Sequence, residues 1–167
     1  MQLYLVRHAI AGDHDPVAWP DDRERPLTTE GIKRFRQAAR GLRALQVTVD
    51  RVLSSRYVRA WQTAEILSTV ARWPAPEPCP ALESDRSPSE AVAALQPYAG
   101  TPALAMVGHE PHLHELASLL LTADGGRAAL EFRKGGVACL HLEAPLRAGA
   151  ATLLWHTPPR LLRAAAG

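Results

Sequence analysis

The first ten residues constrain the fold more than any other part of the chain. Residues 2–6 form an apolar run typical of a buried strand, and the run ends at Arg7 and His8. Small residues follow, so the chain is able to turn tightly there. In an α/β protein the carboxyl end of such a strand faces the crevice where ligands bind. Arginine offers a planar fork of donors to an oxyanion, and histidine serves as nucleophile, base or metal ligand near neutral pH.

Strand patterns alternate with helix patterns along the rest of the chain. A polar, proline-containing loop covers 9–27, and four prolines mark 73–80 as a connection. Apolar spacing and turn signals predict strands at 2–6, 47–53, 103–107, 137–142 and 151–155, helices that begin near 28, 56, 88 and 112, and a helical or frayed tail at 158–167. This order predicts a three-layer α/β/α sandwich with a mostly parallel mixed sheet and an antiparallel edge. The length favours one domain, residues 1–167.

Composition narrows the class of protein. Hydrophobic residues make up 47% and charged residues 22% of the chain, which is typical of a globular protein. The net charge of +2 is too small to indicate nucleic-acid binding on bulk electrostatics. No apolar stretch is long enough for a bilayer, and Arg7 and His8 leave no room for a signal peptide. We therefore expect a cytoplasmic monomer with no nucleic-acid or membrane partner. The two cysteines have no metal-ligand spacing.

The first predicted helix carries a basic face opposite its apolar stripe. A solvated surface is the simpler interpretation of this face, and docking of an acidic partner protein is the alternative. Its residues are Lys33, Arg34, Arg36, Arg40 and Arg43. Further along, His112 and His114 are only two positions apart and do not share a helix face. We expect both histidines at the surface or at the rim of a site.

Chemically active residues gather at three predicted strand ends. The first strand ends at Arg7-His8, the second at Ser54-Ser55 with Arg59 in the helix that follows, and the third at Gly108-His109. Parallel strands bring their carboxyl ends to one side of the sheet, so these groups converge. Helix N-termini also favour anions through their free N–H groups and the helix dipole. The sequence therefore predicts a site for a dianion, and phosphate fits that description best.

Four segments, in order, resemble the motifs of the histidine phosphatase superfamily, which has the phosphoglycerate-mutase-like fold. The segments are Leu5-Val6-Arg7-His8-Ala9, Arg25-Pro26-Leu27-Thr28-Thr29-Glu30-Gly31, Leu53-Ser54-Ser55 with Arg59-Ala60-Trp61-Gln62-Thr63, and Val107-Gly108-His109. The short chain, Ala9 where the wider family usually has glycine, and Lys134-Gly135-Gly136 look most like the SixA-type phosphohistidine phosphatases.

The resemblance implies a role for each residue of the predicted site. His8 would attack phosphorus and form a phosphohistidine intermediate, and a backbone carbonyl or similar group would hold its other ring nitrogen. Arg7 and Arg59 would bind the phosphoryl oxygens, and His109 would complete the pocket as a cation. No metal or other cofactor is expected. Arg56 would either add charge at the pocket rim or point to solvent.

The residue that protonates the leaving group has no clear motif. Glu83 and Glu110 are candidates, and Asp85 is a third. An alcohol leaving group needs a general acid, whereas an imidazole needs less help because its own pKa lies near neutrality. This favours phosphohistidine on a protein as the substrate. A small phosphorylated metabolite, such as a sugar phosphate ester, is the alternative substrate, and a phosphate-binding regulatory module without turnover is the alternative function.

Overall fold

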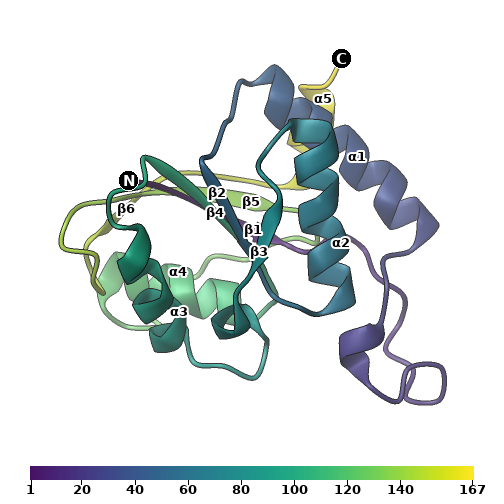
Figure 1. Cartoon of the computed structure of the whole chain (residues 1–167), viewed down its shortest axis with the longest axis horizontal. Helices are drawn as coiled ribbons and strands as arrows, with labels where there is room; N and C mark the ends of the chain where they lie inside the picture. The colour runs from purple at the N-terminus through teal and green to yellow at the C-terminus, as the bar shows by residue number, and fades with distance from the viewer.

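A six-stranded sheet lies at the centre of the computed structural model, which describes residues 1–167 (Figure 1). The strand order is β3-β2-β4-β1-β5-β6. The strands are β1 (Gln2–Arg7), β2 (Arg51–Ser54), β3 (Pro76–Pro78), β4 (Ala103–Gly108), β5 (Val137–Leu142) and β6 (Ala151–Thr157). Strands β3, β2, β4 and β1 are parallel, whereas β5 and β6 form an antiparallel hairpin against β1. The mostly parallel sheet with an antiparallel edge is thus confirmed.

Helices cover both faces of the sheet, as Figure 1 shows. They are α1 (Thr29–Ala44), α2 (Val58–Ile66), α3 (Pro88–Leu95), α4 (His112–Thr122) and α5 (Pro159–Ala164), and a π-helical turn, η2 (Leu67–Ala71), extends α2. Short 3-10 turns occur at η1 (Asp22–Glu24), η3 (Pro80–Leu82) and η4 (Gln96–Tyr98). Thr28 caps α1 by accepting a hydrogen bond from the Gly31 N–H.

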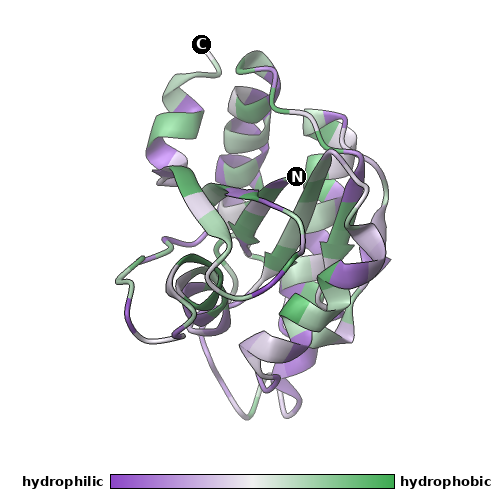
Figure 2. Ribbon diagram, turned by 90° about the vertical axis from the view of Figure 1, so that its left-hand side faces the viewer, coloured by the Kyte–Doolittle hydropathy of each residue, from purple (hydrophilic) through white to green (hydrophobic).

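Alternation along the strands builds the two cores that separate the three layers. Successive strand side chains point to opposite faces, so Tyr4 and Val6 of β1 pack with α1, α2 and α5. Leu3 and Leu5 of the same strand pack with α3 and α4. Figure 2 shows the resulting apolar interior, in which the strands are predominantly hydrophobic. The three-layer arrangement follows directly from this division.

Two predicted boundaries are wrong for physical reasons. Residues 47–50 are not part of β2, because Gln46 adopts a positive φ of 57° and the Val47 carbonyl accepts a hydrogen bond from the Trp73 indole. Residues 76–78 form β3, although their prolines suggested only a connection. Proline has no N–H to donate to a neighbouring strand, which a central strand needs, but it is tolerated in an edge strand such as β3.

The long loop after β1 is held in place along its length. Ala11 pairs with Leu27 in an antiparallel bridge, and the Arg25 guanidinium donates to the Gly12 carbonyl over 2.7 Å. The loop therefore returns to the sheet edge before α1 begins and brings η1 beside the carboxyl ends of the strands. None of the helices combines the length and the apolar character needed to cross a membrane.

Candidate active site

The register of the sheet brings the three predicted strand ends together. Arg7 of β1 lies opposite Gly108 of β4, and Ser54 of β2 lies opposite Val107 of β4. Beyond the last paired residues, the His8 N–H donates to the Gly108 carbonyl over 3.0 Å. His8, Ser55 and His109 consequently emerge side by side at one edge of the sheet.

His8 is a buried ring with one nitrogen fixed by the backbone. Its Nδ1 lies 2.7 Å from the carbonyl oxygen of Ala9, which can only accept, so Nδ1 carries the proton and Nε2 keeps its lone pair. The prediction that a backbone carbonyl holds this ring is confirmed. Burial lowers the pKa of His8 to about 3, and the cations Arg59, Arg7 and Lys134 lower it further against the Ala9 hydrogen bond. The ring is therefore neutral at physiological pH.

His109 faces His8, with their ring centroids 5.2 Å apart. Its Nε2 lies 2.9 Å from the Ser55 hydroxyl, while its Nδ1 is buried and has no hydrogen-bond partner. Burial, and then the charges of His8 and Arg59, lower the pKa of His109 to about 2. In the free protein this ring is neutral, which differs from the expected cation. The reason is desolvation, and a dianion beside the ring would act in the opposite direction.

Arg59 is held from two sides by one residue of the loop. Its guanidinium donates to the Asp22 carbonyl over 2.6 Å and forms an ion pair of 2.8 Å with the Asp22 carboxylate. It also lies over the Tyr57 ring, 5.1 Å from the centroid. Burial opposes ionisation of Asp22, but the Arg25 hydrogen bond and the charge of Arg59 prevail and hold its pKa at about 2.

Arg7 reaches across to the turn before β5. Its Nη1 donates to the Phe132 carbonyl over 2.5 Å, and its Nε is buried without a hydrogen-bond partner. The N–H of the same Phe132 donates to the Glu110 carboxylate over 3.2 Å. Burial raises the pKa of Glu110, and the charge of Arg7 opposes that rise. Glu110 thus sits beside the phosphate-binding candidates and shares a backbone partner with Arg7.

Two of the remaining predicted residues, Glu83 and Asp85, lie around Arg23 at the rim. Glu83 follows η3 and interacts electrostatically with Arg23, which lies over the Tyr57 ring at 5.6 Å from the centroid. Asp85 pairs with the same Arg23 at 3.5 Å. Arg56 is exposed and lines a small surface hollow with Trp61 and Pro78. It therefore points to solvent, the second of its two expected positions.

Several residues around the site were missed at the level of sequence. Asp22 is one of several acidic residues in a polar loop, and no local pattern distinguishes it. Lys134 acts electrostatically on His8 from the turn before β5, where the N–H of Gly135 donates to the carbonyls of Arg7 and His8. Gly135 has a φ of 79°, a conformation that glycine adopts without strain. The lysine and glycines in this segment were the available signal.

His112 is also not where it was expected. The side chain is buried in the first turn of α4, and both ring nitrogens lack a hydrogen-bond partner. Burial lowers its pKa. The expectation that His112 lies at the surface or rim is wrong because the start of α4 packs inward. His114 is half-buried and has its Nδ1 3.0 Å from the Leu130 carbonyl.

Comparison of the chain with known proteins places it in a family. The chain belongs to the histidine phosphatase superfamily, whose branch 1 profile matches residues 3–83. An uncharacterised protein of Picosynechococcus sp. is 35% identical over 163 residues, which cover 96% of this chain and 93% of that protein.

SixA proteins are prominent among the relatives. The phosphohistidine phosphatase SixA of Escherichia coli is 38% identical over 65 residues, which cover 39% of this chain and 38% of SixA. A structure of the protein histidine phosphatase SixA with tungstate superposes with a TM-score of 0.85 at 28% identity, covering 97% of this chain and 99% of that one. An α-ribazole phosphatase from Shigella flexneri shares the fold at 19% identity, with a TM-score of 0.72 and coverage of 95% and 97%.

Proposed function

We propose that the protein is a phosphatase that accepts a phosphoryl group on Nε2 of His8 and then releases it to water. The observation that carries this proposal is the anchored His8 ring, with Nδ1 bound to the Ala9 carbonyl and Nε2 left with its lone pair. The low pKa of His8, about 3, keeps the ring neutral across the physiological range. A neutral imidazole of this kind needs no general base before it attacks phosphorus.

The nitrogen groups around His8, two guanidinium groups and the neutral His109 ring, support a role in stabilising the transition state. Arg7 and Arg59 each keep a buried guanidinium Nε without a hydrogen-bond partner, and His109 keeps a buried Nδ1 in the same condition. In the proposal these donors bind the equatorial phosphoryl oxygens as their charge develops. The guanidinium groups then do the electrostatic work that metal ions do in other phosphoryl-transfer enzymes, so no metal or cofactor forms part of the mechanism.

The proposed reaction has two displacements. In the first, the bond between His8 Nε2 and phosphorus forms while the bond from phosphorus to the leaving nitrogen or oxygen breaks, and the leaving group takes up a proton. In the second, a water oxygen bonds to phosphorus, the bond from phosphorus to Nε2 breaks, and the water proton passes to solvent. Inorganic phosphate is the product, and His8 returns to its neutral form with Nδ1 still bound to Ala9.

Phosphohistidine on a protein is the substrate that we propose. The charges that act most strongly on His8 are cations, namely Arg59, Arg7 and Lys134. An imidazole leaving group suits a site of this kind, because its pKa near neutrality reduces the need for a general acid. The similarity to SixA proteins, named as phosphohistidine phosphatases, supports the same substrate class.

Glu110 favours a second candidate, hydrolysis of a small phosphate ester. Its carboxyl group is half-buried, and burial raises its pKa, which favours a protonated form able to donate to an alkoxide. Glu83 at the rim is the alternative donor, but it lies among the groups around Arg23. Ester hydrolysis would use the same His8 intermediate with a different leaving group.

Trapping the intermediate tests the mechanism. The protein is mixed with a protein labelled with radioactive phosphate on histidine and quenched in alkali within milliseconds. A base-stable, acid-labile label should appear on the phosphatase and be absent in His8→Ala. Phosphate binding without any such label would instead indicate a regulatory module.

A comparison of rates then tests the substrate. The value of kcat/KM is measured for a phosphohistidine protein and for a panel of sugar phosphates and other phosphate esters. We expect the phosphohistidine protein to be preferred. A preference for esters that falls in Glu110→Gln would replace the proposed substrate and leave the His8 intermediate standing.

A further inference from the structure

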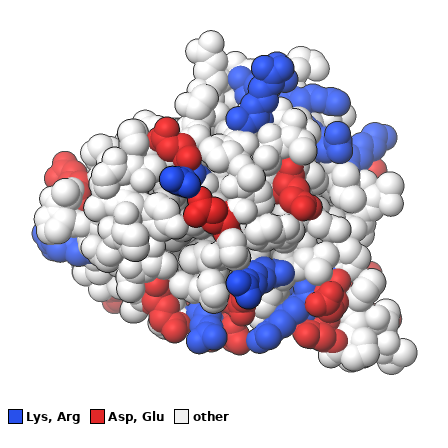
Figure 3. Space-filling model, viewed as in Figure 1, with Lys and Arg blue, Asp and Glu red and all other residues white.

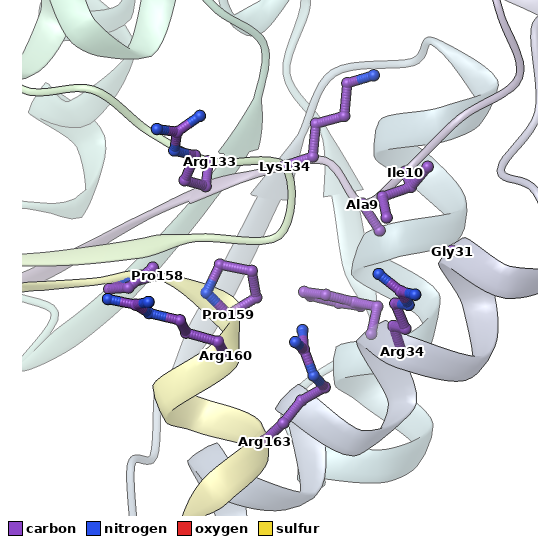
Figure 4. A pocket seen from close by; sticks show the side chains of 11 residues that line it. Ala9, Ile10, Gly31, Arg34, Arg133, Lys134, Pro158, Pro159, Arg160 and Arg163 are labelled. Carbon is purple, nitrogen blue, oxygen red and sulfur yellow. The ribbon is translucent and has the colours of Figure 1, made fainter.

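A basic cavity opens beside the end of β1, on the side of β5. It has a volume of about 510 Å³ and lies between α1, the turn before β5, and α5. Figure 4 shows basic side chains from all three elements around it. No aspartate or glutamate lines the cavity. The lining residues that matter here are Ala9, Arg34, Arg133, Lys134, Arg160 and Arg163.

Three of the five cations have no counter-charge within the protein. Arg34 pairs with Glu30 at 2.6 Å, and Arg133 pairs with Glu131 at 3.1 Å. Lys134, Arg160 and Arg163 form no ion pair. Like charges around one cavity repel each other, and an anion placed between them relieves that repulsion. The basic residues visible over α1 and α5 in Figure 3 add to the positive potential at this end of the molecule.

The cavity adjoins the phosphoryl site through two residues, although Arg7, His8, Arg59 and His109 do not line it. Ala9 lines it, and the carbonyl of Ala9 holds the His8 ring. Lys134 also lines it, and the charge of Lys134 acts on the His8 pKa. A protein segment that carries a phosphohistidine to His8 therefore passes close to the cavity. An extended peptide advances about 3.3 Å per residue, so residues near the phosphorylated one reach α5.

We propose that this cavity binds acidic side chains, Asp or Glu, of the segment that flanks the phosphohistidine in a protein substrate. This inference rests on the proposed function, because it needs a phosphohistidine carried by a protein. The sequence left docking of an acidic partner on the basic face of α1 as the alternative, and Arg34 is the one residue of that face that lines the cavity. The proposed site is built jointly by the start of α1, the turn at 133–134, and α5.

Exposure of the cations favours a peptide over a small phosphorylated molecule. Arg34, Lys134 and Arg160 are exposed rather than buried. An exposed ion pair contributes little by itself, so tight binding of one small anion is not expected here. Several such pairs along an extended acidic segment add up, and they attract the segment over a distance set by the ionic strength.

Two peptides test the proposal with the full-length protein. Each carries one phosphohistidine, flanked in one peptide by four glutamates and in the other by four glutamines. We expect kcat/KM to be about tenfold higher for the glutamate peptide at low salt, as two or three weak ion pairs imply. The preference should disappear near 0.5 M salt, where charges are screened within about 5 Å. Free phosphohistidine amino acid serves as the substrate that cannot reach the cavity.

Charge reversal on α5 identifies the surface involved. Arg160→Glu/Arg163→Glu should remove the preference for the glutamate peptide, through KM, and leave kcat on free phosphohistidine unchanged. Arg40→Glu/Arg43→Glu is the matched control, because these residues have the same spacing, lie on exposed positions of α1, and do not line the cavity. Its second substitution also falls in the last turn of a helix, as Arg163 does.

Each other outcome overturns the docking proposal in a distinguishable way. If the unaltered protein turns over neither peptide, the proposed function fails, and the docking proposal fails with it. If it turns over both peptides equally, or if the control variant loses the preference as well, the function stands and the cavity is not the docking site. If the α5 variant loses activity on free phosphohistidine too, the cavity belongs to the small-molecule site.

Discussion

The ends of β1 and β4 carry two histidines that are both buried and both have a lowered pKa, but that have different hydrogen-bond partners. His8 and His109 lie ring against ring, and burial lowers the pKa of both, to about 3 and about 2. His8 is bound to a backbone carbonyl, which only accepts a hydrogen bond. His109 is bound to the Ser55 hydroxyl, which both donates and accepts. The first arrangement fixes one tautomer, whereas the second allows the ring to exchange protons.

In the proposed mechanism, this difference would give the two strand ends different roles. A fixed tautomer presents the same lone pair to every substrate, as a nucleophile requires. A ring next to a hydroxyl is able to take up a proton when an anion arrives and to lose it when the anion leaves. We therefore interpret the end of β1 as the attacking side and the end of β4 as the adjustable side of the phosphoryl site.

Removing the attacking ring should have the largest effect. His8→Ala should lower kcat by about 10⁴-fold or more, because no other side chain near the site offers a fixed neutral nucleophile. Steady-state turnover of a phosphohistidine peptide measures the loss. Phosphate binding, followed by calorimetry, should persist because Arg7 and Arg59 remain. If His109→Asn lowered kcat as much and also abolished the trapped phosphohistidine label, the two rings would not have the different roles proposed here.

Arg59 acts on both histidines, and its removal should have the next largest effect. Arg59→Ala should lower kcat/KM by about 10²- to 10³-fold, the usual cost of one donor to a developing oxyanion. Asp22→Asn retains the guanidinium and should cost far less, because Asp22 only positions it. Paired kinetics of the two variants make the measurement. Equal losses would show that Asp22 does more than hold Arg59.

The two buried rings should make the protein sensitive to mild acid. Their folded pKa values lie below the ordinary value of 6.5, so the unfolded chain binds more protons and stability falls as pH drops from 6.5 towards 3. Each ring that stays neutral in the folded protein lowers the free energy of unfolding by about 2 kcal/mol between pH 6.5 and pH 5. The ionised Asp22 carboxylate also stabilises the folded protein, and this stabilisation is lost only as the pH falls from 3.8 towards 2.

Urea unfolding at pH 7.5 and pH 5 measures this effect. His109→Asn should reduce the decrease in unfolding free energy between the two pH values. Saturating phosphate should also reduce the decrease, because an anion favours the protonated ring. An identical decrease in the parent protein and in His109→Asn would mean that the ring is not the source of the acid sensitivity.

The smallest effect should come from the hydroxyl next to His109. Ser55→Ala removes the hydrogen bond to His109 and the one that the Tyr57 N–H donates to the Ser55 hydroxyl, and it should lower kcat/KM by about fivefold. Nitrogen NMR of the imidazole should show a changed tautomer for His109 and no change for His8, whose partner is a backbone carbonyl. Ser54→Ala is a matched control, since the Ser54 hydroxyl donates to the Ser55 carbonyl and not to a ring.

Local patterns predicted the elements that depend on local physics. The apolar run at 2–6 and the strand-helix order were sufficient for the sheet and for the convergence of Arg7, His8, Arg59 and His109 at its edge. The roles of these residues remain predictions to be tested. β3 was missed because Pro76 and Pro78 suit an edge strand only in the context of a neighbouring strand. That context is not present in the local sequence.

Long-range contacts account for what the sequence did not predict. Asp22 is 37 residues from Arg59 along the chain, and no local pattern marks it. The segment Lys134-Gly135-Gly136 was noticed in the sequence, but the effect of Lys134 on His8 depends on how the turn before β5 packs against β1. His112 was misplaced because its burial depends on how α4 packs against α3. The neutral state of His109 depends on a desolvation that only the assembled strand ends provide.

Thr63 joins the two halves of the phosphoryl site. Its hydroxyl accepts from the Ala9 N–H over 3.0 Å and donates to the Arg59 carbonyl over 2.7 Å. The backbones of Ala9 and Arg59 are thus both hydrogen-bonded to one oxygen atom, Oγ1 of Thr63. We therefore expect the separation of His8 and Arg59 to stay constant. A phosphoryl group that does not fit this fixed distance would then bind and react poorly.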